Sequence, residues 1–181
     1  MTISEDPVLL TDEPYQRQMT SYRRTRSAIL DGAKALVAAR GLQRANMVDI
    51  ADTAEVSRAT LYNHFRDKPS VMRAVLESEV ARLLQIIDTD LSQEAALAQI
   101  SIEISSDLAF ATMRKTDAGI ITALLTNMQD PLWVQIRIGL HQLLGDEIRT
   151  QIAQRWLVAQ VLQPLSAAQS VEQARRITIS Q

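Results

Sequence analysis

Apolar residues recur at helical spacing along almost the whole chain after residue 20, as in Ile29, Ala33, Leu36 and Val37. No segment shows the alternation of apolar and polar residues that is typical of a strand. Only five Gly and five Pro occur among 181 residues, too few turn residues for most sandwiches and barrels. Since 46% of the residues are apolar, the chain can build a core, and we expect an all-α fold.

The spacing predicts helices over residues 21–40, 47–54, 58–64, 68–88, 93–115, 117–127, 131–144, 146–163 and 170–178. Asn46 and Ser57 are placed to cap the second and third helices, because their side-chain oxygens can accept from free backbone N–H groups. The second helix should bury Val48, Ile50 or Ala51, and Ala54. Residues 1–20 lack periodicity and are expected to form a flexible acidic arm.

The residue types exclude several kinds of site. Cys is absent, and the only two His, His64 and His141, are far apart, so we expect no metal and no cofactor. No glycine-rich phosphate loop, nucleophile elbow or HExxH run occurs, which argues against an enzyme. No apolar run reaches the ~18–20 residues of a membrane span, and the start is acidic, unlike a signal peptide. We therefore expect a cytoplasmic protein without a membrane partner.

Charge is distributed unevenly along the chain. The formal net charge is −2, yet residues 15–70 carry ten basic and five acidic side chains. A basic segment within an acidic protein is typical of a surface that binds nucleic acid, although a solvated helix face would give the same count.

Two short helices separated by a tight turn, residues 46–65, match a helix-turn-helix in length and spacing. In the second helix only Leu61 and Phe65 are clear core anchors, and the remaining side chains are polar or small. Such a helix suits insertion into the major groove of DNA. Arg58 and Ala59, at its N-terminal end, are best placed for base edges, whereas Thr60, Tyr62, His64 and Lys68 suit phosphates.

The run from Asn46 to Leu76, "NMVDIADTAEVSRATLYNHFRDKPSVMRAVL", preceded by "RRTRSAILDGAKALVAARGL", resembles the TetR/AcrR family of bacterial transcriptional regulators. The resemblance implies a three-helix DNA-binding domain over residues 21–67, followed by a helical-bundle domain over 68–181 that dimerises and binds a small molecule. It also implies that Tyr62, Thr60 and Lys68 contact phosphates and that Arg58, Ala59 and His64 face the groove. The full predicted DNA-binding set is Asn46, Ser57, Arg58, Ala59, Thr60, Tyr62, Asn63, His64 and Lys68.

Two residues depart from the family pattern. Glu55 stands in the turn where the family usually has Gly, and a left-handed Glu costs on the order of 1 kcal/mol more than Gly. Pro69 replaces the usual acidic residue and restricts Lys68 toward an extended conformation, which could make Lys68 the N-cap of its helix.

The helix expected over 146–163 is apolar on two sides, so it needs two covering surfaces. One stripe, Leu157, Val158, Val161 and Leu165, would face its own core. The other stripe is predicted to pair with its copy in a homodimer and consists of Ile148, Ile152, Trp156, Ala159 and Leu162. Complete burial within one chain is the alternative.

The predicted effector pocket consists of Asp107, Phe110, Met113, Arg114, Thr122, Leu125, Trp133, Ile136, Arg137 and His141. Pockets of this kind favour apolar or amphipathic ligands, although each residue could simply be core or surface. Together these features predict a homodimer that binds a near-palindromic operator in duplex DNA and is released by a small, mostly apolar effector. A helical interaction module that does not bind DNA is the main alternative.

Overall fold

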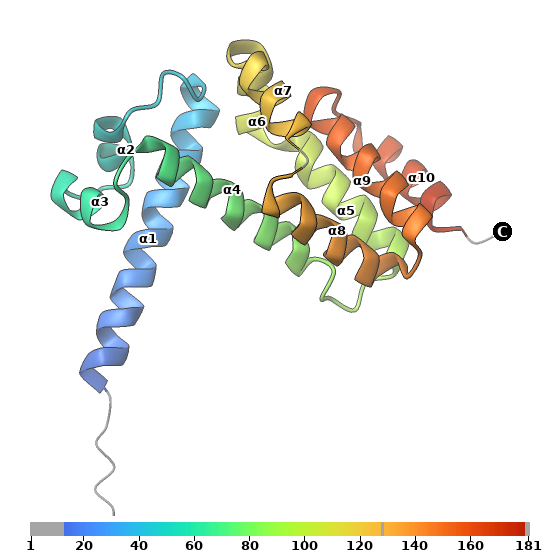
Figure 1. Ribbon diagram of the computed structural model, residues 1–181, viewed down its shortest axis with the longest axis horizontal. Coiled ribbons are helices and arrows are strands. Elements are labelled where there is room, and N and C mark those ends of the chain that lie inside the picture. The colour runs from blue at the N-terminus through green and yellow to red at the C-terminus, as the bar shows by residue number, and fades with distance from the viewer. Residues whose placement is uncertain (1–12, 128, 180–181) are drawn as a thin grey trace, which may run out of the picture.

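The computed structural model describes residues 13–127 and 129–179, which form ten helices and no strand (Figure 1). The helices are α1 (Glu13–Arg40), α2 (Met47–Thr53), α3 (Arg58–His64), α4 (Lys68–Gln85), α5 (Gln93–Ser106), α6 (Leu108–Thr116), α7 (Ala118–Thr126), α8 (Pro131–Leu144), α9 (Glu147–Leu162) and α10 (Ala167–Thr178). The predicted all-α class is confirmed. None of these helices combines the length and apolar composition that a membrane span needs.

Local capping rules account for the start of the two short helices. The Asn46 side chain accepts from the backbone N–H of Asp49, and that of Ser57 accepts from Thr60. Both capping predictions are thus confirmed. The N-cap of α4 is Asp67, which forms a capping box with Ser70, so the expectation that Lys68 could cap this helix is wrong. A carboxylate accepts from free N–H groups, which an ammonium cannot do.

Three predicted boundaries are wrong. Residues 13–20, expected to be flexible, belong to α1, and the rest of the expected arm, residues 1–12, lies outside the described residues. The helix expected over 93–115 is broken at Asp107, whose extended backbone ends α5 and whose carboxylate caps α6. Helix α10 begins at Ala167, because Ser166 and Gln169 form a capping box there.

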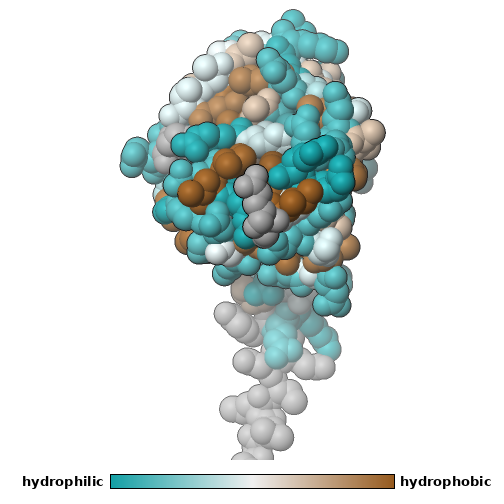
Figure 2. All heavy atoms as spheres, turned by 90° about the vertical axis from the view of Figure 1, so that its right-hand side faces the viewer, coloured by the Kyte–Doolittle hydropathy of each residue, from teal (hydrophilic) through white to brown (hydrophobic). Residues whose placement is uncertain are grey.

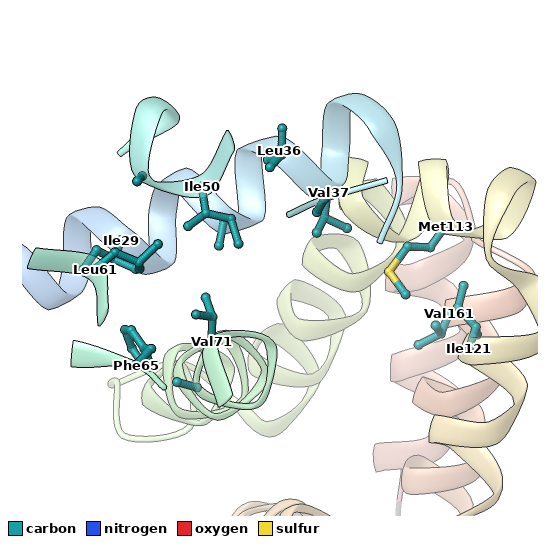
Figure 3. Close-up of a cluster of buried hydrophobic side chains, with 14 residues drawn as sticks. Ile29, Leu36, Val37, Ile50, Leu61, Phe65, Val71, Met113, Ile121 and Val161 are labelled. Atoms are coloured by element: carbon teal, nitrogen blue, oxygen red, sulfur yellow. The ribbon is translucent and has the colours of Figure 1, made fainter. Parts of the chain in front are cut away.

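The first four helices form a head built around a small apolar core. Ile29, Ile50, Leu61 and Val71 are fully buried and come from α1, α2, α3 and α4 respectively, and Figure 3 shows them converging. Val48 is 36% exposed, so its predicted burial is wrong, and the core position in this turn of α2 belongs to Ile50 and Ala51. Seven-residue helices cannot persist alone in water, so this core is what keeps α2 and α3 in place.

A second core lies between α5, α8, α9 and α10 and includes Leu97, Leu140 and Leu157. A buried polar junction fixes the register of three of these helices. The Ser101 hydroxyl of α5 lies 2.6 Å from Oε1 of Gln160 in α9 and 2.7 Å from the hydroxyl of Ser170 in α10. Because all three side chains are buried and hydrogen-bonded, sliding one helix past another would leave polar groups unpaired.

The head and the bundle meet at the loop between α1 and α2. The Asp117 carboxylate, 2% exposed, accepts from the backbone N–H groups of Leu42 (2.8 Å) and Gln43 (3.0 Å) and from the Thr116 hydroxyl (2.6 Å). Gly41 has a φ of +85°, and a Cβ there would lie 2.3 Å from the Thr116 hydroxyl. Glycine therefore allows both the left-handed turn and the close approach of α6.

Asp117→Ala should lower the free energy of unfolding by about 2–4 kcal/mol, because two partly buried backbone N–H groups lose a charged acceptor. Burial opposes the carboxylate charge, but the hydrogen bonds from Thr116, Gln43 and Leu42 outweigh it and lower the pKa of Asp117. The contribution should therefore be present at neutral pH and lost as the pH falls through this lowered pKa. Urea unfolding at several pH values measures it. Asp52→Ala, an exposed acid on α2, is the control, and equal effects of both variants would contradict the prediction.

Candidate nucleic-acid interface and effector cavity

Helix α3 is attached to the head by one side and exposes the other. Leu61 is fully buried and Phe65 is 5% exposed, which confirms the two predicted anchors. At 100° per residue, the exposed side chains of Arg58, Ala59, Tyr62 and Asn63 all fall within about 140° of the helix circumference. We call these four residues the reading face. It presents a guanidinium, a methyl, a phenol and a carboxamide, groups that suit base edges and phosphates.

The other predicted DNA-binding residues have structural partners. Asn46 and Ser57 cap their helices, and the Ser57 hydroxyl also lies 2.8 Å from that of Thr60. Lys68 donates to the backbone carbonyls of Leu42, Gln43 and Ala45, at 2.9, 3.3 and 2.8 Å. An ammonium has three protons to donate, so Lys68 holds the α1–α2 loop with all three, and its contact with a phosphate stays a prediction.

His64 turns toward α1, away from the reading face. Its ring stacks on that of Tyr22 with 4.2 Å between centroids, and its Nδ1 is buried without a hydrogen-bond partner. Burial and the nearby Arg26 lower the pKa of His64, which favours the neutral ring at neutral pH. The structure therefore places His64 where the last turn of α3 meets α1, outside the reading face, and its contact with DNA stays a prediction.

Electrostatics elsewhere in the head support this arrangement. The Arg26 guanidinium lies 4.5 Å from the centre of the Phe65 ring, and Arg40 pairs with Asp49 of α2 at 3.2 Å. These contacts join α1 to both short helices. In the described residues no group of His, Asp and Glu is arranged to hold a metal ion.

Two adjacent cavities lie between α4 and the helices that follow it. One of about 130 Å³ is lined by the predicted residues Phe110, Leu125, Trp133 and Ile136. Another of about 190 Å³ is lined by the predicted residues Asp107, Phe110 and Met113. The two cavities share an apolar wall made of Leu76, Val80, Leu83, Ile104, Phe110 and Leu124.

Four predicted pocket residues line neither cavity. Arg114 donates to the backbone carbonyl of Val161 (3.0 Å), and the Thr122 hydroxyl donates to the backbone carbonyl of Ala118 (3.0 Å). Arg137 and His141 are exposed on α8, where His141 lies 3.8 Å from Glu147. Helical spacing alone does not tell which side of a helix faces a cavity: Thr122, Arg137 and His141 lie on exposed sides, and the half-buried Arg114 joins α6 to α9.

The 190 Å³ cavity also reaches α1, which the sequence did not predict. Lys34 and Val37 of α1 lie in its wall. Lys34 pairs with Glu79 of α4 at 2.7 Å and with Asp107 at 3.0 Å. A molecule in this cavity would thus touch the first helix of the head directly.

The two apolar stripes of α9 have different surroundings. Leu157 and Val161 are buried, as predicted, whereas Ile148, Ile152 and Leu162 are 70%, 49% and 46% exposed. The alternative of complete burial within one chain is therefore wrong. Trp156 is half-buried and its indole N–H donates to Oε1 of Gln173 (2.6 Å), so it belongs partly to the chain's own core. Figure 2 shows apolar side chains gathered in patches on the end of the molecule toward the C-terminus.

Comparison with known proteins finds sequence matches for the helices of the head. Residues 29–75 match the model for bacterial regulatory proteins of the tetR family. The HTH-type transcriptional regulator TtgR of Pseudomonas putida is 33% identical over 63 residues, which are 35% of this chain and 30% of TtgR. The HTH-type transcriptional repressor KstR2 of Rhodococcus jostii is 34% identical over 76 residues, 40% of this chain and 37% of KstR2. The matches thus span about a third of these relatives.

Solved structures extend the likeness to the whole fold. A transcriptional regulator of Streptomyces coelicolor, SCO7518, superimposes with a TM-score of 0.61 and 20% identity over 87% of this chain and 99% of its own. The dihydroxyacetone kinase operon activator DhaS superimposes with a TM-score of 0.62 and 14% identity, over 85% of this chain and 93% of DhaS. At these identities the likeness concerns the arrangement of the helices.

Glu55→Gly should raise the free energy of unfolding by about 1 kcal/mol, because Glu55 has a φ of 55° in the turn before α3. Urea denaturation measures the change. The same substitution at Glu77, exposed inside α4, should instead lower stability by about 0.5–1 kcal/mol. A loss of stability at both positions would show that the Glu55 side chain makes a compensating interaction.

Proposed function

Since the chain belongs, by its N-terminal domain, to the TetR/AcrR family of bacterial regulators, we propose that it is a homodimeric transcriptional repressor. It binds an operator through α3 and is released by a small molecule in the C-terminal domain. The observation that carries this proposal is the reading face, four exposed side chains on a short helix anchored by Leu61 and Phe65. Such a regulator acts where the DNA is, in the cytoplasm, and needs no enzymatic activity.

Operator recognition follows from two copies of the reading face. In a twofold dimer the two α3 helices would enter successive major grooves about 34–36 Å apart, which requires a near-palindromic site. Arg58 at the N-terminal end of α3 is placed for a guanine edge, and Tyr62 for a phosphate. The basic balance of residues 15–70 favours the approach to DNA although the whole chain is acidic.

Dimerisation follows from the exposed stripe of α9. Ile148, Ile152 and Leu162 would bury their apolar surface against the same residues of a second copy. Burial of such side chains contributes about 25 cal/mol per Å². The residual exposure of this stripe in the single chain supports a second copy as its cover.

Release by an effector follows from the position of the cavities. Both are lined mainly by apolar side chains, which favours an apolar or amphipathic molecule. A ligand that binds better when the two heads are wrongly spaced for the operator lowers DNA affinity by coupling, without competing for the reading face. The cavity wall at Lys34 and the Asp117 contact with the α1–α2 loop give this coupling a short path.

Selection from a random duplex library, with binding measured over a range of salt, tests the proposal. The wild-type chain should recover a near-palindromic sequence and lose affinity steeply with salt, because counterions are released. Arg58→Ala should cost ~1–3 kcal/mol at one base position, whereas Tyr62→Phe should weaken all sequences alike. Lys115→Gln, in the C-terminal domain, is the control. Absence of sequence preference in the wild type would contradict the proposal and favour a helical interaction module.

Ile152→Glu should convert the dimer to a monomer, because a charge would be buried in the twofold contact. Light scattering and sedimentation measure the mass. Leu91→Glu places the same charge on another exposed apolar residue, in the connection between α4 and α5, and should leave the dimer intact. A dimer that persists in the Ile152 variant would place the interface on another surface.

A further inference from the structure

We infer that the N-terminal part of α1, residues 13–28, is a second DNA-binding element that contacts the phosphates flanking the site read by α3. This inference rests on the proposed function and extends it. The element precedes residues 29–75, the part that matches the family model, so the match does not assign it a role. It is 16 residues of helix, about 24 Å at 1.5 Å per residue.

Its charge is the first argument. Residues 13–28 contain four arginines, Arg17, Arg23, Arg24 and Arg26, and one acidic residue, Glu13 at the start of the helix. Arg23 and Arg24 are exposed, and within the described residues neither makes a hydrogen bond or an ion pair. Arg26 differs because it packs over the Phe65 ring and belongs to the head. The guanidinium group suits phosphate because its planar donors match the phosphate oxygens.

Its position is the second argument. Tyr22 stacks on His64, the last residue of α3, so Arg23 and Arg24 follow directly after a contact with the reading helix. Figure 1 shows α1 projecting beyond α2 and α3 on the side away from α5–α10. If α3 lies in a major groove, this projection lies beside the backbone that borders the groove. The Tyr22–His64 contact would then fix the distance between the two DNA-binding elements.

Its surroundings are the third argument. Gln16, Met19 and Thr20 are exposed, and in contrast to Ile29 and Ala33 they take no part in a core. Met19 and Tyr22 remain 36% and 46% exposed, and Tyr22 packs on His64, so this segment buries little apolar surface within its own chain. The guanidinium groups of Arg23 and Arg24 are therefore available to a partner, and their positive charge favours a polyanion.

The test uses the full chain, the operator recovered by selection, and two duplexes. One duplex ends at the last base pair needed for sequence preference, and the other carries about ten further base pairs of scrambled sequence on each side. The double variant Arg23→Ala/Arg24→Ala should bind the long duplex about tenfold more weakly. It should also reduce the slope of log K against log salt by about 2 per bound protomer. The recovered base sequence should not change, because phosphate contacts carry no sequence information.

Three comparisons make the outcome decisive. Arg23→Lys/Arg24→Lys should recover most of the affinity and slope, since a point charge still binds phosphate. Lys115→Gln/Arg176→Gln removes the same amount of charge from the C-terminal domain and should leave the affinity and the salt slope unchanged. On the short duplex, wild type and the Arg23/Arg24 alanine variant should bind nearly alike. Circular dichroism checks that the helix content is kept.

The inference is overturned if wild type and the Arg23/Arg24 alanine variant bind the long duplex with equal affinity and slope. It is also overturned if the alanine variant binds more tightly, because the arginines would then serve the acidic residues of the chain's own N-terminal segment. Neither result contradicts the proposed function, provided that the wild type selects an operator. A wild type that selects no operator overturns both.

Discussion

The contact of Asp117 with the α1–α2 loop is the constraint on which the two-part architecture depends. One buried carboxylate at the junction of α6 and α7 accepts from two consecutive backbone N–H groups of the head. Lys68 completes the arrangement from the other side by donating to carbonyls of the same loop. The loop is thus held at both its donors and its acceptors, which joins α6 and α4 to the segment that leads into α2.

The same junction places the cavity where it can act. Burial opposes the charge of Lys34, but its bonds to Glu79 and Asp107 outweigh that effect and raise its pKa, so the pair of bridges persists at neutral pH. Lys34 thereby ties α1 to α4 and to the α5–α6 corner in the wall of the 190 Å³ cavity. The apolar core of the head also continues into Met113, Ile121 and Val161 (Figure 3). A ligand that separated these elements, as proposed, would therefore act on the head directly as well as through α4.

Features that depend on a few neighbouring residues could be predicted from the sequence. The Asn46 and Ser57 caps, the anchors Leu61 and Phe65, and the inward stripe of α9 are of this kind. Features that depend on residues far apart in the chain could not. The sequence suggests a phosphate contact for Lys68. It does not show that the carbonyls of the α1–α2 loop, more than twenty residues away in the chain, accept from its ammonium. The N-terminal part of α1 was missed because apolar periodicity detects only helices that have a core to cover.

The size of α3 explains why fewer residues are free than the motif suggests. A helix of seven residues makes two turns, and two anchors together with their neighbours occupy about half of its circumference. Thr60 and His64 lie between the anchored side and the reading face, so one joins the cap and the other packs on Tyr22. Only positions 58, 59, 62 and 63 remain. The attachment that keeps so short a helix in place thus also limits how many of its side chains are free for the proposed contact with DNA.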